Sequence, residues 1–190
     1  FVKKFPNIKL NIFYKTNDEL QNMLFRKEID VMLAFKPETI AEQIESHNLF
    51  EDKLCAIVAK DNVLAKKRSI TLEEIAEHPL ILPAEGTQAR NMIDRVLKTN
   101  PVELKPKIVI NEITPILMLV SYGEMISILS GLSTKTRPDV VAVPIDVAGN
   151  TMEGAFLILK NSYFKRSAKE FIKLLCETQL LRLKMDSLFN

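Results

Sequence analysis

The stretch KTNDELQNMLFRKEIDVMLAF, from Lys15 to Phe35, reads as a capped amphipathic helix that leads into a buried strand. Thr16 to Glu19 have the pattern of a capping box, in which a threonine and a glutamate three residues later satisfy free N–H groups at a helix start. Ile29–Phe35 is a nearly continuous apolar run, which is typical of a strand covered on both faces. This stretch predicts a helix–strand unit of an α/β fold with polar residues at the helix start.

The same alternation continues along the 190-residue chain. Strands are expected at Ile8–Tyr14, Ile29–Phe35, Leu54–Ala59, Leu80–Leu82, Lys107–Ile110, Met125–Leu129, Val140–Val143 and Ala155–Leu159. Helices are expected at Asn17–Lys27, after Thr71, at Thr87–Lys98, at Thr114–Tyr122 and at Arg166–Lys184. Alternation of this kind predicts an α/β fold with mostly parallel sheets.

Two turns have the composition of hinges. LILPAEGTQ (80–88) and AFLILKNSYF (155–164) each leave a buried strand and enter polar residues. If the chain leaves one lobe at the first turn and returns at the second, lobe I is 1–83 plus 160–190, and lobe II is 84–159. A discontinuous lobe joined by two crossings is the layout of a hinged binding cleft.

Composition and missing motifs exclude several classes of function. The 26 basic and 24 acidic residues give a net charge of +2, so no excess charge favours nucleic acid or anionic lipid. No apolar run approaches the ~20 residues that span a bilayer. Cys55 and Cys176 are expected as free buried thiols of a reducing cytoplasm rather than as a disulfide. The chain has no phosphate loop, nucleophile elbow or metal-ligand cluster, so we expect no cofactor, no metal and no catalysis.

Three predicted helix starts remain as candidate binding features: Thr16–Glu19, Gly86–Thr87 and Thr114–Pro115. Helix N-termini present unpaired N–H groups and partial positive charge, so they bind anions and carboxylates. In parallel α/β sheets these starts lie at the carboxyl ends of strands, where ligands bind. The alternative is that each residue only caps its helix.

The order of these segments resembles the effector-binding domain of LysR-type transcriptional regulators. Four segments carry the resemblance over essentially the whole chain: FVKKFPNIKLNIFYKTNDELQNMLFRKEIDVMLAF (1–35), LFEDKLCAIVAKDNVLAKKRSITLEEIAEHPLIL (49–82), INEITPILMLVSYGEMISILS (110–130) and AFLILKNSYFKRSAKEFIKLL (155–175). The resemblance implies a two-lobed, periplasmic-binding-protein-like (type 2) fold that senses a small effector for a cytoplasmic transcription regulator. The winged helix-turn-helix and first strand of that family do not occur in this sequence.

The resemblance also implies where the effector binds. The site candidates are Thr16, Asn17, Phe35, Glu85, Gly86, Thr87, Thr114, Pro115, Ile116 and Ser130. A cap role is the alternative for Thr16, and core packing is the alternative for Phe35. The sequence departs from the family pattern where Lys27 and Met125 replace glycines and where Ser130 replaces a proline.

The helix starts favour a small carboxylate or other anion as effector, whereas Glu85 favours an amine-bearing ligand such as an amino acid. The resemblance further implies a homodimer, or a tetramer of the full-length regulator. In the dimer, Phe1, Val2, Phe5 and Ile8–Tyr14 of one copy would meet Thr87–Lys98 of its partner. Promoter DNA would be bound only through the missing domain. A secreted solute-binding protein of the same fold is the alternative function, and a small transferase would require a catalytic motif that the chain lacks.

Overall fold

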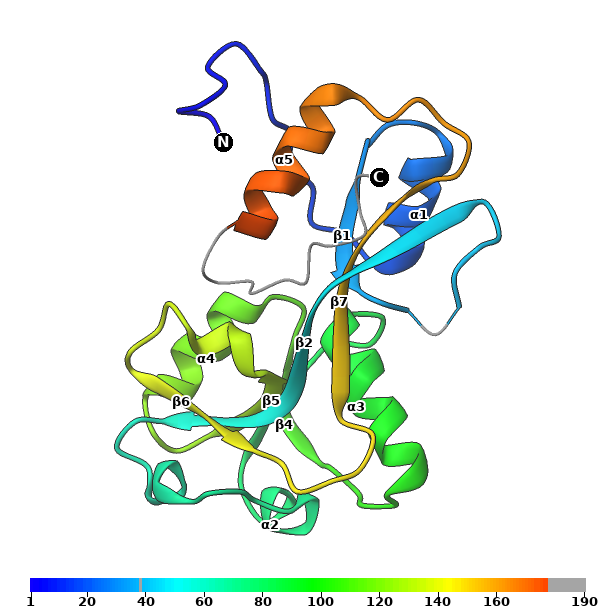
Figure 1. The fold of residues 1–190 in the computed structure, drawn as a ribbon. Coiled ribbons are helices and arrows are strands. Elements are labelled where there is room, and N and C mark those ends of the chain that lie inside the picture. The colour runs from blue at the N-terminus through cyan, green and yellow to red at the C-terminus, as the bar shows by residue number, and fades with distance from the viewer. Residues whose placement is uncertain (38, 178–190) are drawn as a thin grey trace. The chain divides into compact units, whose positions relative to one another are not determined.

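The computed structural model describes residues 1–37 and 39–177, and it is a mixed α/β protein (Figure 1). The elements are α1 (Asn17–Phe25), β1 (Met32–Phe35), β2 (Ile44–Ala59), η1 (Val63–Lys66), α2 (Leu72–Ala76), β3 (Leu80–Pro83), α3 (Gln88–Thr99), β4 (Pro106–Ile110), α4 (Ile113–Ser121), β5 (Ile126–Ser130), η2 (Gly131–Thr134), β6 (Val140–Pro144), β7 (Thr151–Leu159) and α5 (Arg166–Glu177). Within the described ranges, none of the helices combines the length and apolar character that crossing a bilayer would need.

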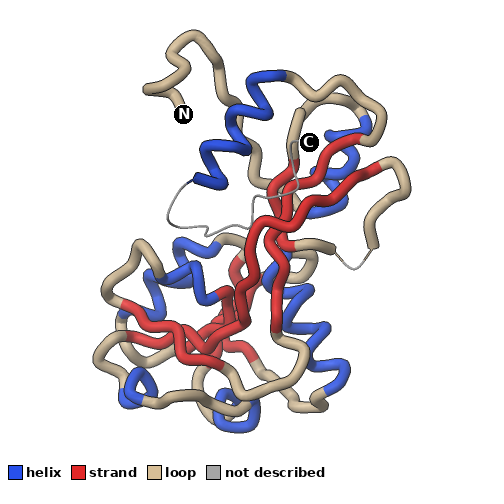
Figure 2. Tube along the Cα trace, in the orientation of Figure 1, coloured by secondary structure: helices blue, strands red, loops and turns tan. Residues whose placement is uncertain are grey.

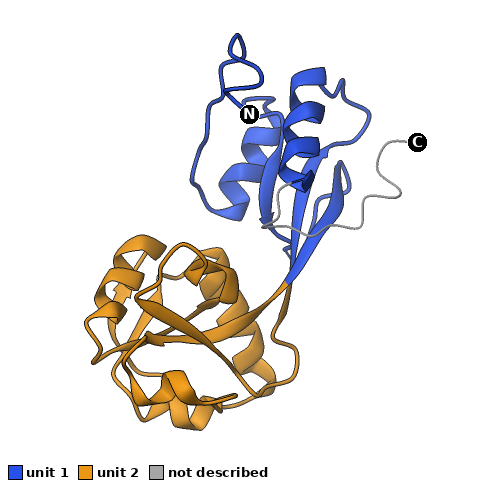
Figure 3. Ribbon diagram, turned by 60° about the vertical axis from the view of Figure 1, so that its left-hand side comes forward, with its two compact units in different colours: residues 1–51, 153–190 blue, residues 52–152 orange. Residues whose placement is uncertain are grey.

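The chain divides into two compact units (Figure 3). Unit 1 contains residues 1–51 and the chain from Glu153 onward, and unit 2 contains Asp52–Met152. The predicted boundaries, after residues 83 and 159, differ from these. β3 pairs with β4 and β5 inside unit 2, so the segment 52–83 belongs there.

The true crossings lie inside strands, which explains why the sequence did not mark them. β2 runs without interruption from Ile44 to Ala59, and β7 begins at Thr151 just before the return to unit 1 (Figure 2). Glycine and proline mark turns, but a strand that continues from one unit to the next needs neither. Lys160 and Asn161, where a hinge was expected, form an ordinary turn at the end of β7.

Unit 1 has helices on both faces of a small antiparallel ladder. β1 pairs with β7, with Met32 opposite Leu157 and Phe35 opposite Gly154. Successive strand residues point to opposite faces. Ala155 and Leu157 accordingly join the core of α1, whereas Phe156 joins the core of α5 (Figure 1).

An aromatic contact spans three neighbouring strands of unit 1. The ring of Phe50 on β2 lies over Gly154 on β7, where an added Cβ would be 2.2 Å from the ring Cζ. The same ring meets Phe35 on β1 edge-on, at a centroid distance of 5.9 Å. Glycine is required here because any side chain would occupy the space of the ring.

The predicted strand at Ile8–Tyr14 was wrong. The segment is irregular, and Leu10, Ile12, Phe13 and Tyr14 are exposed. An alternating pattern becomes a strand only when a partner strand supplies hydrogen bonds. Within the described residues β1 pairs only with β7, so this segment has no such partner.

Unit 2 combines parallel and antiparallel pairing, so the prediction of mostly parallel sheets was too simple. β3 is parallel to β4 and β5, but β2 is antiparallel to β5 and β6. Helix α4 packs against this sheet through Ile116, Leu117 and Val120. The buried residues of the sheet in this core include Ile57, Ile81 and Leu129.

The predicted helices agree closely with the observed ones, because their caps are local. The capping boxes Thr16–Glu19 and Thr71–Glu74 are both formed. Helix α5 begins at Arg166 as predicted and is described to Glu177. The last residues of the predicted helix, 178–184, lie outside the described part of the chain.

Lys27 adopts a backbone conformation that favours glycine. It follows α1 with φ of 57°. The Glu28 N–H donates to Met23 O and the Lys27 N–H to Leu24 O, both at 2.9 Å, which is the Schellman arrangement of a helix end. The turn therefore has a left-handed residue with a Cβ, a conformation that costs a lysine more than a glycine.

We expect Lys27→Gly to raise the free energy of unfolding by about 1 kcal/mol, because glycine adopts positive φ without steric strain. Urea unfolding followed by circular dichroism measures the change. Lys27→Ala is the matched control, since it removes the charged side chain but keeps the Cβ. Equal stabilities of the glycine and alanine variants would show that strain at this turn is negligible.

The two cysteines are free and buried, as predicted. Cys55 lies in unit 2 and Cys176 in unit 1, whereas the predicted boundaries placed both in one lobe. Burial raises the pKa of the Cys55 thiol to about 11, and the nearby Asp52 charge acts in the same direction. Burial also raises the pKa of Cys176. Both side chains are therefore neutral thiols at physiological pH.

Because the thiolate is the reactive form, Cys55 in a Cys176→Ser variant should react about 100-fold more slowly with Ellman's reagent at pH 8 than a thiol of pKa 9.0. The raised pKa also means that folding disfavours the thiolate, so the stability from this group falls as pH rises from 9 toward 11. Rapid labelling of the native protein would contradict the burial of Cys55.

Candidate functional site

Thr16 is the N-cap of α1 in unit 1, and its polar atoms are used within the cap. Its Oγ1 accepts from the Glu19 N–H at 3.4 Å and donates to Glu19 Oε2 at 2.9 Å. The Thr16 N–H donates to the same carboxylate at 3.0 Å. These hydrogen bonds lower the pKa of Glu19. The geometry gives Thr16 the cap role that was the alternative reading.

Asn17 is the first residue of α1 and has an open acceptor. Its side-chain Oδ1 is buried and has no hydrogen-bond partner among the described residues. A buried polar atom without a partner costs roughly 1–3 kcal/mol, so such atoms are rare and often meet a ligand. Phe35, the other candidate of unit 1, packs edge-on against Phe50.

In unit 2, three parallel strands end at a common edge. Pro83 of β3 lies opposite Ile110 of β4, and Ile81 lies opposite Ser127 of β5. Helix α3 starts after β3 and helix α4 starts after β4, so both N-termini are at this carboxyl edge. The loop 84–87, the start of α4 and Ser130 are therefore brought to one side of unit 2, as the sequence predicted for ligand-binding residues.

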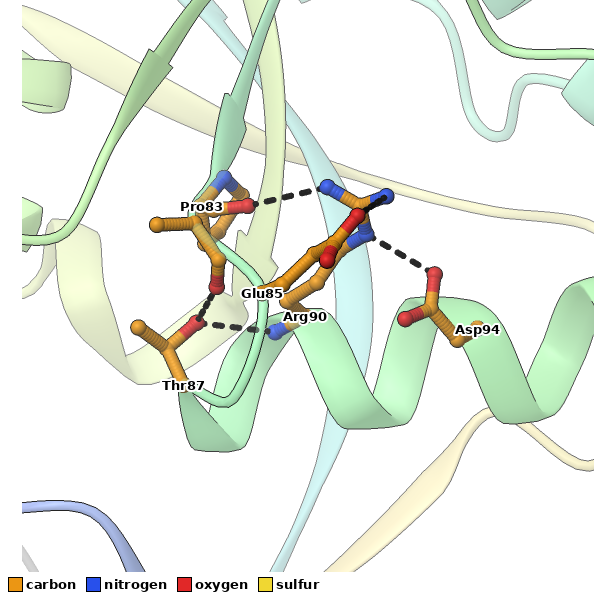
Figure 4. A network of polar contacts seen from close by, with 6 residues as sticks. Pro83, Glu85, Thr87, Arg90 and Asp94 are labelled. Atoms are coloured by element: carbon orange, nitrogen blue, oxygen red, sulfur yellow. Dashed lines mark hydrogen bonds and ion pairs between the residues drawn. The ribbon is translucent and has the colours of Figure 1, made fainter.

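The loop before α3 is tied to the helix by a polar network (Figure 4). Thr87 is the N-cap, and its Oγ1 donates to Ala84 O at 2.7 Å and accepts from the Arg90 N–H at 3.3 Å. Gly86 has φ of 79°, a conformation that glycine allows at little cost. Thr87 is therefore a cap residue whose helix leaves its first N–H groups free of backbone partners.

Arg90 holds three groups of this network. Its guanidinium donates to Asp94 Oδ1 at 2.8 Å and to Pro83 O at 3.3 Å, and it lies 3.8 Å from Glu85 Oε1 (Figure 4). The side chain of Glu85 is 87% exposed, so this last ion pair is weak. Arg90 nevertheless keeps a positive charge beside the acidic loop.

The start of α4 differs from the prediction. The N-cap is Glu112, without a side-chain cap bond, so Thr114 and Pro115 are the second and third residues of the helix. Proline is tolerated throughout a first turn because those N–H groups have no helical partner. Thr114 is exposed and Pro115 half-buried, whereas Ile116 is fully buried in the α4 core.

Ser130 ends β5, and its partner was not predicted. Its hydroxyl donates a short hydrogen bond to Asp52 Oδ2, which also accepts from the Leu132 N–H at 3.0 Å. Asp52 lies two residues before Leu54, which pairs with Ser130. The sequence signal for this contact is weak, an acidic residue two positions before the apolar run that begins at Leu54.

The described residues contain no cluster of side chains suited to bind a metal ion. In residues 1–37 and 39–177, no group of three or more His, Cys, Asp or Glu side chains is placed to hold a metal ion. Met125, which replaces a family glycine, is half-buried against the α4 core. The polar groups at the carboxyl edge of unit 2 can instead form hydrogen bonds and weak ionic contacts with a small molecule.

Comparison with known proteins identifies the family. Residues 1–179 match the LysR substrate binding domain. The uncharacterized HTH-type transcriptional regulator YvbU of Bacillus subtilis is 26% identical over 138 residues, which cover 73% of this chain and 46% of YvbU. The chain thus spans about half the length of this curated relative.

Solved structures show the same fold. The regulatory domain of CcmR from Synechocystis PCC6803 in complex with 2-PG superposes with a TM-score of 0.78 at 17% identity, covering 92% of this chain and 85% of that one. The effector binding domain of QuiR in complex with shikimate gives a TM-score of 0.74 at 24% identity, covering 95% and 84%. These findings confirm the two-lobed, type 2 periplasmic-binding-protein-like α/β fold, and the chain belongs to the LysR substrate binding domain family.

Proposed function

We propose that this chain is the effector-sensing part of a LysR-type transcription regulator. It binds a small molecule, performs no chemistry itself, and acts in the cytoplasm on promoter DNA that another domain of the complete protein contacts. The observation that carries the proposal is the common edge of unit 2, where three parallel strands end and two helices begin. Family membership supports the same function.

The ligand we propose is a small polar molecule with a carboxylate or other anionic group. CcmR was solved with 2-PG and QuiR with shikimate, which are small ligands of this kind. In unit 2 the first turn of α3 offers free N–H groups, which contribute roughly 0.3–1 kcal/mol of attraction for an anion, and in unit 1 the first turn of α1 offers the same groups. Asn17 adds an amide next to one of these turns.

The proposed regulation depends on a difference in ligand affinity between two conformations of the domain. A ligand that binds one conformation of the domain more tightly shifts the population toward it, and a tenfold difference in affinity corresponds to about 1.4 kcal/mol. This coupling changes the geometry that the regulator presents to its promoter, and promoter binding changes the affinity for the ligand by the same factor.

A thermal-shift screen of small organic acids, amino acids and inorganic anions tests the site. A ligand bound by unit 2 should bind Thr114→Val, and a ligand bound by unit 1 should bind Asn17→Ala, with an affinity lowered about twofold to tenfold, the value of one hydrogen bond. Asn7→Ala is the matched control, because Asn7 is an exposed asparagine outside the candidate residues. If the ligand stabilises the parent and both site variants equally, these helix starts do not bind it.

We further propose that two copies associate through the exposed apolar segment Ile8–Tyr14 of one copy and α3 of the other. Ile12 is 66% and Tyr14 93% exposed, which leaves considerable apolar area to bury. Phe1 and Phe5 contribute less than expected. Phe1 already packs on Phe171 of α5 at a centroid distance of 5.4 Å and on Phe5 at 5.0 Å.

Light scattering at high micromolar concentration should give the mass of a dimer for the parent protein. Ile12→Asp should raise the dissociation constant at least about tenfold, because burial of an isoleucine contributes roughly 1.5–3 kcal/mol. Val63→Asp is the control, since Val63 is 78% exposed in unit 2 but lies outside the proposed interface. A monomeric parent would contradict the dimer.

A further inference from the structure

The hydroxyl hydrogens of three candidate residues are all engaged within the protein. Thr16 donates to Glu19, Thr87 donates to Ala84 O, and Ser130 donates to Asp52. A hydroxyl has one hydrogen and two acceptor lone pairs. These side chains therefore have no hydrogen left for a ligand oxygen, which changes what the site can recognise.

Ser130 differs from the two threonines in how much of its acceptor capacity is used. Thr16 and Thr87 also accept a backbone N–H in their caps, but no intramolecular donor approaches the Ser130 oxygen in the described hydrogen bonds. Its oxygen therefore keeps acceptor capacity that none of the described hydrogen bonds uses. Ser130 is only 9% exposed, so this acceptor can reach only a group that contacts it directly.

Asp52 holds this hydroxyl in place. One carboxylate oxygen, Oδ2, accepts from both the Ser130 hydroxyl and the Leu132 N–H, the latter at 3.0 Å. The other oxygen lies 3.3 Å from the position that a Cβ on Gly131 would occupy. The carboxylate is thus packed against the turn 130–132, and a carboxylate can only accept hydrogen bonds.

We propose that Asp52 is a positioning residue that makes Ser130 a pure acceptor, so that this site selects effectors with a hydroxyl or ammonium donor. The proposal rests on the proposed effector-binding function and names its ligand class. The Asp52 charge also disfavours an anionic group beside Ser130, because like charges repel. The carboxylate of the effector then faces the start of α3, which lies at the same edge of unit 2.

The favoured effector is therefore a hydroxy acid or an amino acid rather than a simple carboxylate. Such a molecule has both an anionic group for the helix N–H groups and a separate donor for Ser130. This assignment reconciles the two tendencies of the sequence, helix starts that attract anions and acidic side chains that attract donors.

Matched ligand pairs test the proposal by calorimetry: glycolate with acetate, lactate with propionate, alanine with propionate, and shikimate with cyclohexene-1-carboxylate. At least one donor-bearing member should bind the parent about tenfold more tightly than its partner, the effect of one hydrogen bond. Asp52→Ala should lower this ratio toward one, because Ser130 then has no carboxylate to donate to and its hydrogen is free for a ligand acceptor.

Ser130→Ala should lower the ratio equally, and adding Asp52→Ala to it should cause no further change, because Asp52 acts through Ser130. Asp61→Ala is the control, an exposed acid of the same unit whose ratio should match the parent. Urea melts establish that each variant is folded. A general loss of stability would lower both affinities but would leave their ratio unchanged.

Two results would overturn the inference: simple carboxylates that bind as well as their donor-bearing partners, or a ratio that Asp52→Ala leaves unchanged. If no pair member binds the parent, the inference also fails. The proposed function is judged separately, because the thermal-shift screen includes ligands that lack these groups. The proposed function would fail if no small molecule in that screen stabilised the protein.

Discussion

Two strands that belong to both units impose the main constraint on this structure. β2 leaves unit 1 and enters unit 2 without a break, and β7 makes the return. β2 pairs with β5 and β6 in unit 2, and β7 pairs with β1 in unit 1, so the two segments that join the units are also strands of their sheets.

Local signals in the sequence predicted the elements well, whereas their long-range relations were harder to predict. The helices after Thr16, Thr71 and Thr87 begin as expected, because a cap hydrogen bond links residues only three positions apart. Ile8–Tyr14 has the alternation of a strand but no partner, and pairing is a property of two segments. The unit boundaries escaped prediction because the chain crosses inside strands.

Some residues of the candidate site were predicted from the sequence, and others were not. Family resemblance and helix starts pointed to the carboxyl edge of unit 2, which the parallel pairing of β3, β4 and β5 brings together. Asp52 was missed because its partner Ser130 is 78 positions away. The Thr114–Pro115 pair was misread as a cap because proline is accepted at several positions of a first turn. A binding role for Asn17, Thr114 and Ser130 stays a prediction.

The ring of Phe50 over Gly154 has a consequence for how this sequence can change during evolution. The two positions share one volume, because the ring fills the space that a side chain at 154 would need. A larger residue at 154 is tolerable only after position 50 becomes smaller, so the two sites should covary rather than drift independently. Position 35 belongs to the same set, since Phe35 completes the contact from β1. Related sequences in which positions 35, 50 and 154 have all changed would then be ones in which this part of unit 1 is packed differently.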